Sequence, residues 1–355
     1  MMKKQIAVDV TPLSRDQRGM GHFASGFLQA WAEIRPADVD LSLVTASDAG
    51  VVPKELLHSF PLMRVADLLN EWTLWSPFNL PSFKTSAPTI LTIHDLTPFA
   101  FPLGEAKLRQ KYTQAISAAI HVIASSQYTQ TEIKKYLNLP DSKISTAYLG
   151  FDPNLDPGNE RIDYPSKYIF AIGTSEPRKN FDGLLRAFAK LKRRGIPHRL
   201  VILGDNPTWP SSFGPWIIRK KNPLQGLASS LKIDSAVNLL GAVEKRSTVL
   251  SWYRHASLVA VPSFYEGFGY PVLEAFAAEI PLACSRAASL TEVAGQGAFY
   301  FDPHDIDEMV EAILEALSNT YEVEKKKKIG KEQLARFSWK NCIERYAEIF
   351  RTVIP

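Results

Sequence analysis

Two glutamates eight residues apart stand in the segment VPSFYEGFGYPVLEAFAAEIP (261–281). Glu266 lies in a loop after a strand-like run. Glu274 falls in the first turn of a helix that Pro271 can begin, because proline's missing N–H is not needed there. Carboxylates placed like this can accept hydrogen bonds from two polyhydroxyl groups. The alternatives are a surface-turn role for Glu266 and a helix-dipole role for Glu274.

The residues between these glutamates suit a phosphate. Gly267 and Gly269 let the backbone approach a ligand closely. The helix start that follows offers unpaired N–H groups and a partial positive charge. We therefore expect a diphosphate between the two polyhydroxyl groups.

Two adjacent cations, Arg178 and Lys179, stand in GTSEPRKNFDGLL (173–185). They precede a helix for which Asn180 is the expected N-cap. Cations at a helix N-terminus oppose its dipole unless an anion sits between them. This conflict indicates a bound phosphate, and the alternative is a solvated surface pair.

Two further segments lie in the first half of the chain. TIHDLTP (92–98) places His94 and Asp95 at the end of a buried strand, although a lone histidine there is usually structural. Gly19 and Gly21 belong to a glycine-containing loop that enters a helix. They form no dinucleotide fingerprint, because the third glycine is replaced by Ala24.

Short apolar runs, typical of strands buried on both faces, alternate with helical patterns along the chain. These strands and helices must position the candidate residues named above. Such alternation predicts a doubly wound α/β fold, and it occurs twice. The expected strands are 5–10, 41–46, 88–95, 121–126, 144–150, 168–173, 199–205, 236–241, 257–263, 281–285 and 298–303. Ligands of such sheets sit outside the carboxyl ends of the strands, and two facing domains would form a cleft there.

A Pro-, Asp- and Gly-rich stretch (151–168) is the best linker candidate, with a boundary near Asp163. We expect an N-terminal domain at 1–163 and a C-terminal domain at 164–336. The amphipathic helix expected within 337–355 would form a third segment.

Composition excludes several classes of protein. The 355 residues are 45% hydrophobic and 22% charged, which is ordinary globular composition. A net charge of +4 is too mild to indicate a nucleic-acid partner. Two cysteines cannot build a disulfide scaffold or, alone, a zinc cluster. We expect a cytoplasmic protein.

The segment 261–281 resembles the C-terminal signature of glycosyltransferase family 4, a retaining family with the GT-B fold. Every position of the pattern E-G-F-G-x-P-x-x-E is present. The resemblance implies that Glu266 contacts the donor sugar and that Glu274 contacts the ribose hydroxyls. It also implies that the backbone of 267–269 meets the sugar and the diphosphate. The GT-B fold that it implies has an acceptor-binding N-terminal domain (1–163), a nucleotide-sugar-binding C-terminal domain (164–336) and a final helix (337–355) that crosses back to the N-terminal domain.

The G-T-x-E-P-R-K-N form is similar to that of the family's bacterial polysaccharide mannosyl- and glucosyltransferases, whose basic pair binds the donor diphosphate. His-Asp-Leu resembles the active-site segment of the family's N-terminal domain, and R-G-M-G-H-F resembles a loop that closes over the diphosphate or the acceptor. The resemblance implies the catalytic residues His94, Glu266, Arg178 and Lys179. The implied donor-binding residues are Gly173, Thr174, Gly204, Leu240, Gly267, Phe268, Gly269, Tyr270, Val272 and Glu274, while Gly19, Gly21 and Asp95 are assigned to the acceptor or the loop.

These features predict a retaining glycosyltransferase that moves a hexose from a nucleoside-diphosphate sugar, of the UDP-glucose or GDP-mannose type, to a glycan or lipid-linked acceptor of surface polysaccharide synthesis. Neither a cofactor nor a metal is expected, since no suitable acidic pair is evident. One alternative is a non-hydrolysing sugar-nucleotide epimerase, and another is a non-catalytic sugar-nucleotide-binding subunit. A nicotinamide-dependent oxidoreductase is disfavoured because no G-x-G-x-x-G follows a strand.

Aromatic residues with basic neighbours raise the further prospect of peripheral contact with the inner face of a membrane. They are Trp72, Trp75 and Phe78, together with Trp209 and Trp216 beside 219–221. The alternative is packing of irregular loops against the sheets.

Overall fold

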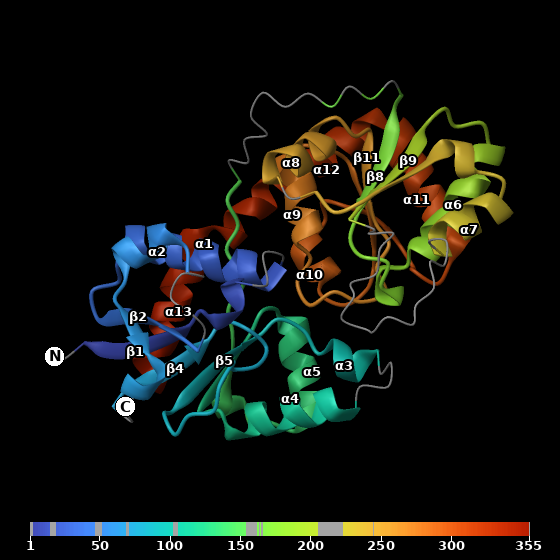
Figure 1. Cartoon of the computed structure of the whole chain (residues 1–355). Helices are drawn as coiled ribbons and strands as arrows, with labels where there is room; N and C mark the ends of the chain where they lie inside the picture. The colour runs from blue at the N-terminus through green and yellow to red at the C-terminus, as the bar shows by residue number, and fades with distance from the viewer. Residues whose placement is uncertain are drawn as a thin grey trace. The chain divides into compact units, whose positions relative to one another are not determined.

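The computed structural model consists of two compact units (Figure 1). The first comprises Met1–Asp152 and Arg336–Pro355, and the second comprises Pro153–Ala335. Asp163, the expected boundary, lies outside the described residues. The structure describes residues 3–14, 19–46, 52–68, 71–101, 106–153, 162, 164, 166–204, 223–243 and 245–354.

The first unit is built on a parallel seven-stranded sheet in the order β3-β2-β1-β4-β5-β6-β7. The strands are β1 (Lys4–Asp9), β2 (Val39–Thr45), β3 (Leu62–Arg64), β4 (Thr73–Ser76), β5 (Thr89–Ile93), β6 (His121–Ala124) and β7 (Ile144–Thr146). The helices are α1 (Gly19–Ile34), α2 (Lys54–Ser59), α3 (Thr97–Ala100), α4 (Ala106–Ala118), α5 (Gln127–Leu137) and α13 (Trp339–Val353).

The chain's last helix, α13, packs against α1 within this unit (Figure 1). A Cβ atom on Gly26 of α1 or on Gly150 would overlap the indole of Trp339, so only glycine leaves room for this ring. Further along α13, Tyr346 contacts Phe27 of α1 with ring centroids 4.9 Å apart. Close packing of aromatic rings therefore fixes α13 on the first unit.

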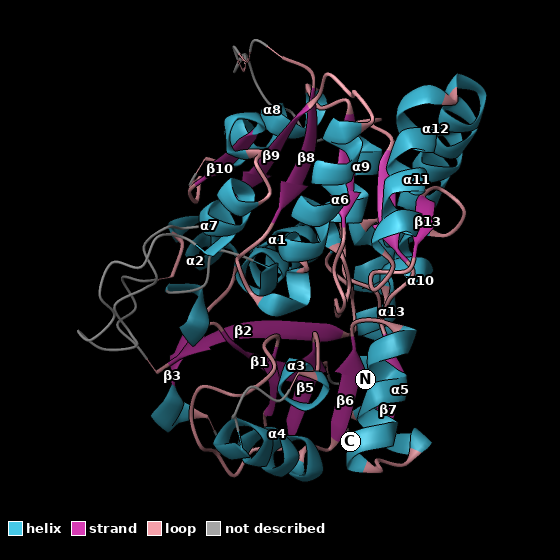
Figure 2. Cartoon of the chain, turned by 90° about the vertical axis from the view of Figure 1, so that its right-hand side faces the viewer, coloured by secondary structure: helices cyan, strands magenta, loops and turns pink. Residues whose placement is uncertain are grey.

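The second unit contains a parallel six-stranded sheet in the order β10-β9-β8-β11-β12-β13. The strands are β8 (Tyr168–Ile172), β9 (Arg199–Leu203), β10 (Val237–Leu240), β11 (Leu258–Val261), β12 (Leu282–Ser285) and β13 (Phe299–Phe301). The helices are α6 (Phe181–Arg193), α7 (Pro223–Ser230), α8 (Arg246–Arg254), α9 (Tyr270–Ala277), α10 (Leu290–Ala294), α11 (Ile306–Ser318) and α12 (Thr320–Leu334). Figure 2 shows helices beside the strands of both sheets.

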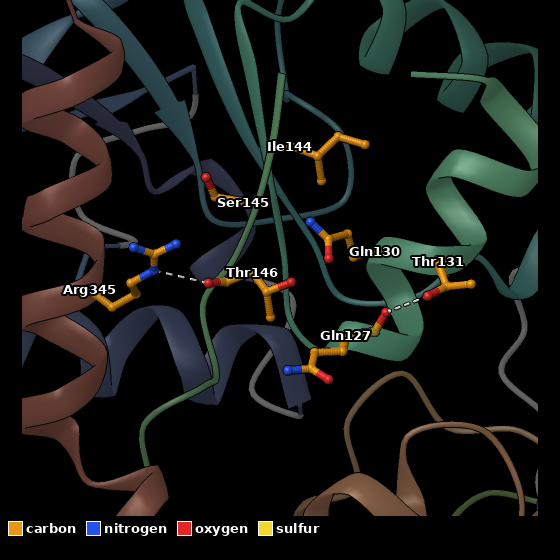
Figure 3. Close-up of a pocket in the computed structure, with 7 residues that line it drawn as sticks. All are labelled: Gln127, Gln130, Thr131, Ile144, Ser145, Thr146 and Arg345. Atoms are coloured by element: carbon orange, nitrogen blue, oxygen red, sulfur yellow. Dashed lines mark hydrogen bonds between the residues drawn. The ribbon is translucent and has the colours of Figure 1, made fainter. Parts of the chain in front are cut away.

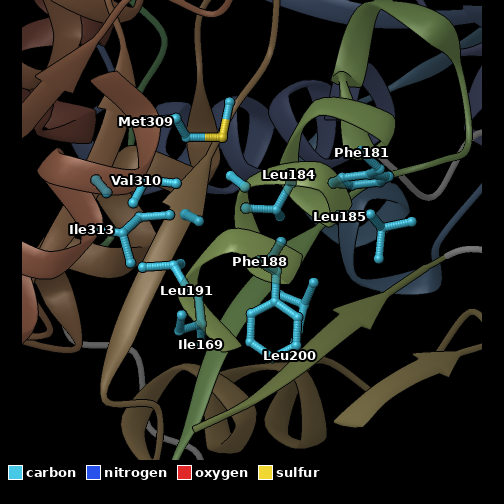
Figure 4. Packing of buried hydrophobic residues seen from close by; sticks show 14 of the residues in the cluster. Ile169, Phe181, Leu184, Leu185, Phe188, Leu191, Leu200, Met309, Val310 and Ile313 are labelled. Carbon is cyan, nitrogen blue, oxygen red and sulfur yellow. The ribbon is translucent and has the colours of Figure 1, made fainter. Parts of the chain in front are cut away.

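One face of this second sheet is covered by α6 and α11 (Figure 4). The large buried residues Phe181, Leu184, Phe188 and Leu191 of α6 recur every three or four positions, which is the period of a helix with one apolar face. Phe181, Leu184 and Phe188 of α6 join Val310 and Ile313 of α11 in this core. The position of Phe181 matters for the site, because Lys179 and Arg178 lie only two and three residues before it.

The predicted α/β class is confirmed, and every expected strand has a counterpart. The sequence reading missed β3 and the central strand β4, whose residues it treated as irregular. Trp75 and Phe78 are buried in the core, so these two side chains offer no surface to a membrane. Trp72 packs against a buried cluster that includes Leu74, while Trp209, Trp216 and 219–221 lie outside the described residues. No helix in the described ranges is both long and apolar enough to cross a membrane.

In both sheets the order in which the chain adds strands reverses at an interior position. Counted within each unit, six strands follow the order 3-2-1-4-5-6 of dinucleotide-binding folds. The order reverses between β1 and β4 in the first unit and between β8 and β11 in the second. Ligands of open α/β sheets bind at such a switch point, so the loops after these four strands are the places to examine.

Candidate functional site

The switch point of the second unit holds a cluster of charged side chains. Glu266, in the loop after β11, is buried and meets the two cations of the loop after β8. Its Oε1 lies 2.6 Å from Lys179 Nζ, and its Oε2 lies 3.2 Å from Arg178 Nη1. Ser263 Oγ donates a third hydrogen bond to Oε1 at 2.8 Å. The anion that the sequence placed between the cations is, in this structure, the Glu266 carboxylate.

The charges of this cluster determine the protonation of Glu266. Burial alone would raise the pKa of the Glu266 carboxyl, but the cations Lys179 and Arg178 outweigh it and hold that pKa below its ordinary value. Arg178 also donates from Nε to Glu176 at 2.7 Å. The side chains of Lys179 and Arg178 keep 13% and 18% of their surface exposed, so both can still be reached by a ligand.

Asn180 ties the cations to the sheet. Its backbone is left-handed, with φ of 54°, and its side-chain oxygen caps α6 by accepting from the Gly183 amide at 3.2 Å. Its side-chain nitrogen donates to the carbonyls of Pro262 and Pro303 at 3.0 and 2.9 Å. One buried side chain therefore fixes the end of the cationic loop against the loop that carries Glu266.

The second glutamate has a different environment. Glu274 lies beyond the first turn of α9, so neither the expected first-turn position nor a helix-dipole role fits. Its carboxylate is buried, with Oε1 2.6 Å from Arg246 Nη1 and Oε2 accepting from Tyr253 Oη at 2.6 Å. Both partners come from α8. Sequence reasoning missed Arg246 and Tyr253, because no local pattern marks them.

The loop between the glutamates is shaped by glycine and serine. Gly269 has φ of 113° and precedes α9, a conformation that favours glycine. Ser289 Oγ lies 2.8 Å from the carbonyl oxygens of both Glu266 and Phe268, and its one proton can be donated to either. Of the remaining predicted residues here, Tyr270 begins α9 with its ring against that of Phe268, and Val272 is buried with its amide donating to the Gly269 carbonyl.

Four other predicted residues, Gly173, Thr174, Gly204 and Leu240, lie at or next to neighbouring strand ends of the same sheet. The Gly173 amide donates to the carbonyl of Leu203, and the Gly204 amide donates to that of Leu240, both at 3.0 Å. A Cβ on Gly204 would come within 3.1 Å of the Gly173 carbonyl oxygen, so glycine permits this close approach. Thr174 donates to Glu176 at 2.8 Å.

In the first unit, His94 follows β5 and is anchored on the loop after β4. Its Nε2 lies 2.8 Å from the Pro77 carbonyl, which can only accept, so this nitrogen carries the proton. Its amide donates to Asn79 Oδ1 at 2.6 Å. Asp95 accepts from the Thr97 amide at 3.1 Å.

The two glycines expected in an N-terminal loop lie instead in the first turn of α1, which begins at Gly19. The helix starts earlier than the sequence suggested because glycine at a helix end, where few backbone bonds are lost, costs little. The preceding residues 15–18 lie outside the described residues.

The first unit also has a polar pocket of about 410 Å³ at the β7 edge of its sheet, between α5 and α13 (Figure 3). Arg345 Nε donates there to the Thr146 carbonyl at 3.2 Å. None of the predicted residues lines this pocket. Its lining residues are Gln127, Gln130, Thr131, Ile144, Ser145, Thr146 and Arg345.

Comparison with known proteins agrees with a fold of two Rossmann-like units. The architecture matches GT-B glycosyltransferase structures. One is Anabaena Alr3699/HepE in complex with UDP and glucose, with a TM-score of 0.75, 18% identity and coverage of 98% of this chain and 100% of that one. At this level of identity the likeness shows the fold, and the sequence comparison shows that the protein is a glycosyltransferase enzyme.

The family follows from the sequence. Residues 154–335 match the model of the glycosyl transferases group 1, and the chain belongs to this family. It is 30% identical over 279 residues to the O-antigen chain mannosyltransferase B of Escherichia coli, covering 75% of this chain and 70% of that protein. It is 25% identical over 336 residues to the O-antigen chain mannosyltransferase RfbU of Salmonella typhimurium, covering 84% and 87%.

The interactions of Asn180 lead to a prediction about stability. Asn180→Ala removes a helix cap and leaves two carbonyls without their donor, so the free energy of unfolding should fall by about 2–4 kcal/mol. Asn319→Ala is the matched control, because Asn319 caps α12 through one bond to the Glu322 amide. It should cost about 1 kcal/mol. Urea denaturation of both variants checks the difference, and equal losses would contradict the bridging role.

The lowered pKa of Glu266 predicts a dependence of stability on pH. A carboxyl with a folded-state pKa below its ordinary 4.5 stabilises the protein above that pH, and the contribution is lost as pH falls through the folded-state value. The stability advantage of the wild type over Glu266→Gln should therefore be largest above pH 4.5 and shrink below it. Urea denaturation from pH 7 to pH 3.5 measures this, and an advantage that grows in acid would contradict the ion pairing.

Proposed function

We propose that this chain is a retaining glycosyltransferase that moves a hexose from a nucleoside-diphosphate sugar to a glycan or lipid-linked acceptor. The observation that carries the proposal is the pairing of Lys179 and Arg178 with Glu266 at the switch point of the second unit. Two partly exposed cations held there suit the diphosphate of a donor. The second unit would bind this donor, and the first unit would bind the acceptor.

The cations have a defined task in the reaction. An acceptor hydroxyl oxygen bonds to the anomeric carbon while the bond from that carbon to the diphosphate oxygen breaks. The hydroxyl proton passes to the departing phosphate oxygen, which attack from the leaving-group face allows. Negative charge develops on the diphosphate as the bond breaks, and Lys179 and Arg178 stabilise it electrostatically. His94 would lie near the reacting sugar.

The relatives favour one donor. Both mannosyltransferases described above are named for the O-antigen chain, so we propose mannose as the hexose, GDP-mannose as the donor and surface polysaccharide as the product. No step as proposed requires a metal ion. The Anabaena structure that shares the fold contains UDP and glucose, which makes UDP-glucose the competing donor.

A donor screen tests the class and the choice of sugar together. GDP-mannose, UDP-glucose and ADP-glucose are added separately to the full chain with EDTA present, and thermal unfolding is recorded. A donor at about 100 times its dissociation constant should add roughly 2.7 kcal/mol of stability. Stabilisation by GDP-mannose is expected. Stabilisation by UDP-glucose alone would overturn the donor, and the absence of stabilisation by any of the three would overturn the class of substrate.

The second test concerns catalysis. Lys179→Ala removes a charged contact worth about 2–4 kcal/mol in the transition state. Transfer of radiolabelled mannose from GDP-mannose to a mannose oligosaccharide should therefore slow at least tenfold. Lys190→Ala is the control, because this exposed lysine of α6 pairs with Asp307 away from Glu266, and its rate should stay the same. An unchanged rate in Lys179→Ala would remove Lys179 from the site, and isomerised donor without transfer would indicate an epimerase.

A further inference from the structure

The carboxylate of Glu274 is held from both sides by one face of α8. Arg246 and Tyr253 are seven residues apart, which is two helical turns, so both project from the same face. Arg246 Nη1 reaches Oε1 and Tyr253 Oη reaches Oε2, each at 2.6 Å. With one partner on each oxygen, the carboxylate cannot rotate without breaking a short hydrogen bond or ion pair.

Both partners keep their role over the physiological pH range. Tyr253 is completely buried, and burial together with the charge of Glu274 raises its pKa well above the ordinary value. Its hydroxyl therefore stays protonated and donates. Burial alone would lower the pKa of Arg246, but the Glu274 charge raises it, so the guanidinium stays cationic. The Tyr253 ring is also fixed, since it packs edge-on against Phe170 with centroids 4.9 Å apart.

This arrangement leaves a defined part of Glu274 available to a ligand. A carboxylate has about four acceptor positions, two on each oxygen. Arg246 and Tyr253 occupy one on each, so one remains on each oxygen. Two acceptor positions side by side match two neighbouring hydroxyls that both donate. A vicinal diol of this kind is present in the ribose of a nucleotide.

We infer that Arg246 and Tyr253 are positioning residues, which orient Glu274 so that its two remaining acceptor positions bind the 2′- and 3′-hydroxyls of the donor's ribose. The inference rests on the proposed function and on the ribose contact that the family resemblance implies for Glu274. It adds that recognition of the diol depends on α8 through its hold on this carboxylate. Loosening the carboxylate should then weaken diol binding specifically and leave binding of the diphosphate unchanged.

The test compares nucleotides with and without the diol. Calorimetry on the full chain measures the affinity of GDP and 2′,3′-dideoxy-GDP, with UDP and 2′,3′-dideoxy-UDP run in parallel. Hydrogen bonds to a charged group support a preference of about tenfold or more for the diol-bearing nucleotide in the wild type. In Tyr253→Phe and Arg246→Gln this preference should fall at least threefold, with dideoxy-nucleotide affinity unchanged. Glu274→Gln should lose most of it.

Two controls separate a local effect from general damage. Tyr168→Phe removes another buried tyrosine hydroxyl of the second unit, which donates to the Trp252 carbonyl at 2.8 Å. It should keep the full diol preference. Lys179→Ala should weaken both nucleotides of a pair equally, since both carry the diphosphate. Tyr253→Phe keeps the ring and its packing, so it remains informative if Arg246→Gln fails to fold.

The possible outcomes distinguish failure of the positioning role from failure of the proposed function. A preference lost in Glu274→Gln but intact in Tyr253→Phe and Arg246→Gln would overturn the positioning role and leave the proposed function standing. A wild type that binds the diol-bearing and dideoxy-nucleotides equally would overturn the ribose role of Glu274. If no nucleotide of either pair binds, both the proposed function and the inference are wrong.

Discussion

Burial of the Glu266 carboxylate is the constraint on which the second unit's switch point depends. A carboxylate taken out of water costs several kcal/mol unless cations and hydrogen-bond donors compensate for it. Lys179 and Arg178 supply the charge and Ser263 supplies a hydroxyl. These partners come from the loops after β8 and β11. Their bonds to one buried carboxylate therefore hold together the ends of the two strands between which the strand order reverses.

The two units show how one topology supports different chemistry. At the switch point of the first unit, the buried carboxylate of Asp9 accepts from the amides of Thr11 and Ser82 at 3.0 and 2.8 Å. The Asp9 carboxylate therefore holds the backbone of neighbouring loops in place. The contacts of His94 with Pro77 and Asn79 do the same. The second unit places two cations at the equivalent position. Among the described residues, this difference supports the proposal that the second unit binds the anionic part of a donor.

The sequence predicted the alternation of strands and helices because short, continuous apolar runs between helical patterns are compatible with few other folds. It missed β4, since four residues with one tryptophan carry no alternation and their burial comes from β1 and β5 on either side. Residues in distinctive local patterns, such as Lys179 in 173–185, could be singled out. Their partners could not, because Lys179 and Glu266 are 87 residues apart and Tyr253 is an ordinary apolar-face residue of α8. Contacts between residues far apart in the sequence depend on the fold's topology, and local spacing along the chain does not reveal them.

The surroundings of Glu266 also bear on how the transfer step can proceed. An effective general base needs a pKa near the working pH, and a nucleophilic carboxylate needs an accessible lone pair. Lys179 and Arg178 lower the pKa of Glu266 and each occupy one of its oxygens. Glu274, eight residues on, has each of its oxygens bound by a residue of α8. The lowered pKa makes Glu266 a poor base, and the remaining acceptor positions of Glu274 are those inferred above to bind the donor's ribose. Both points favour a step in which the departing phosphate oxygen takes the acceptor's proton.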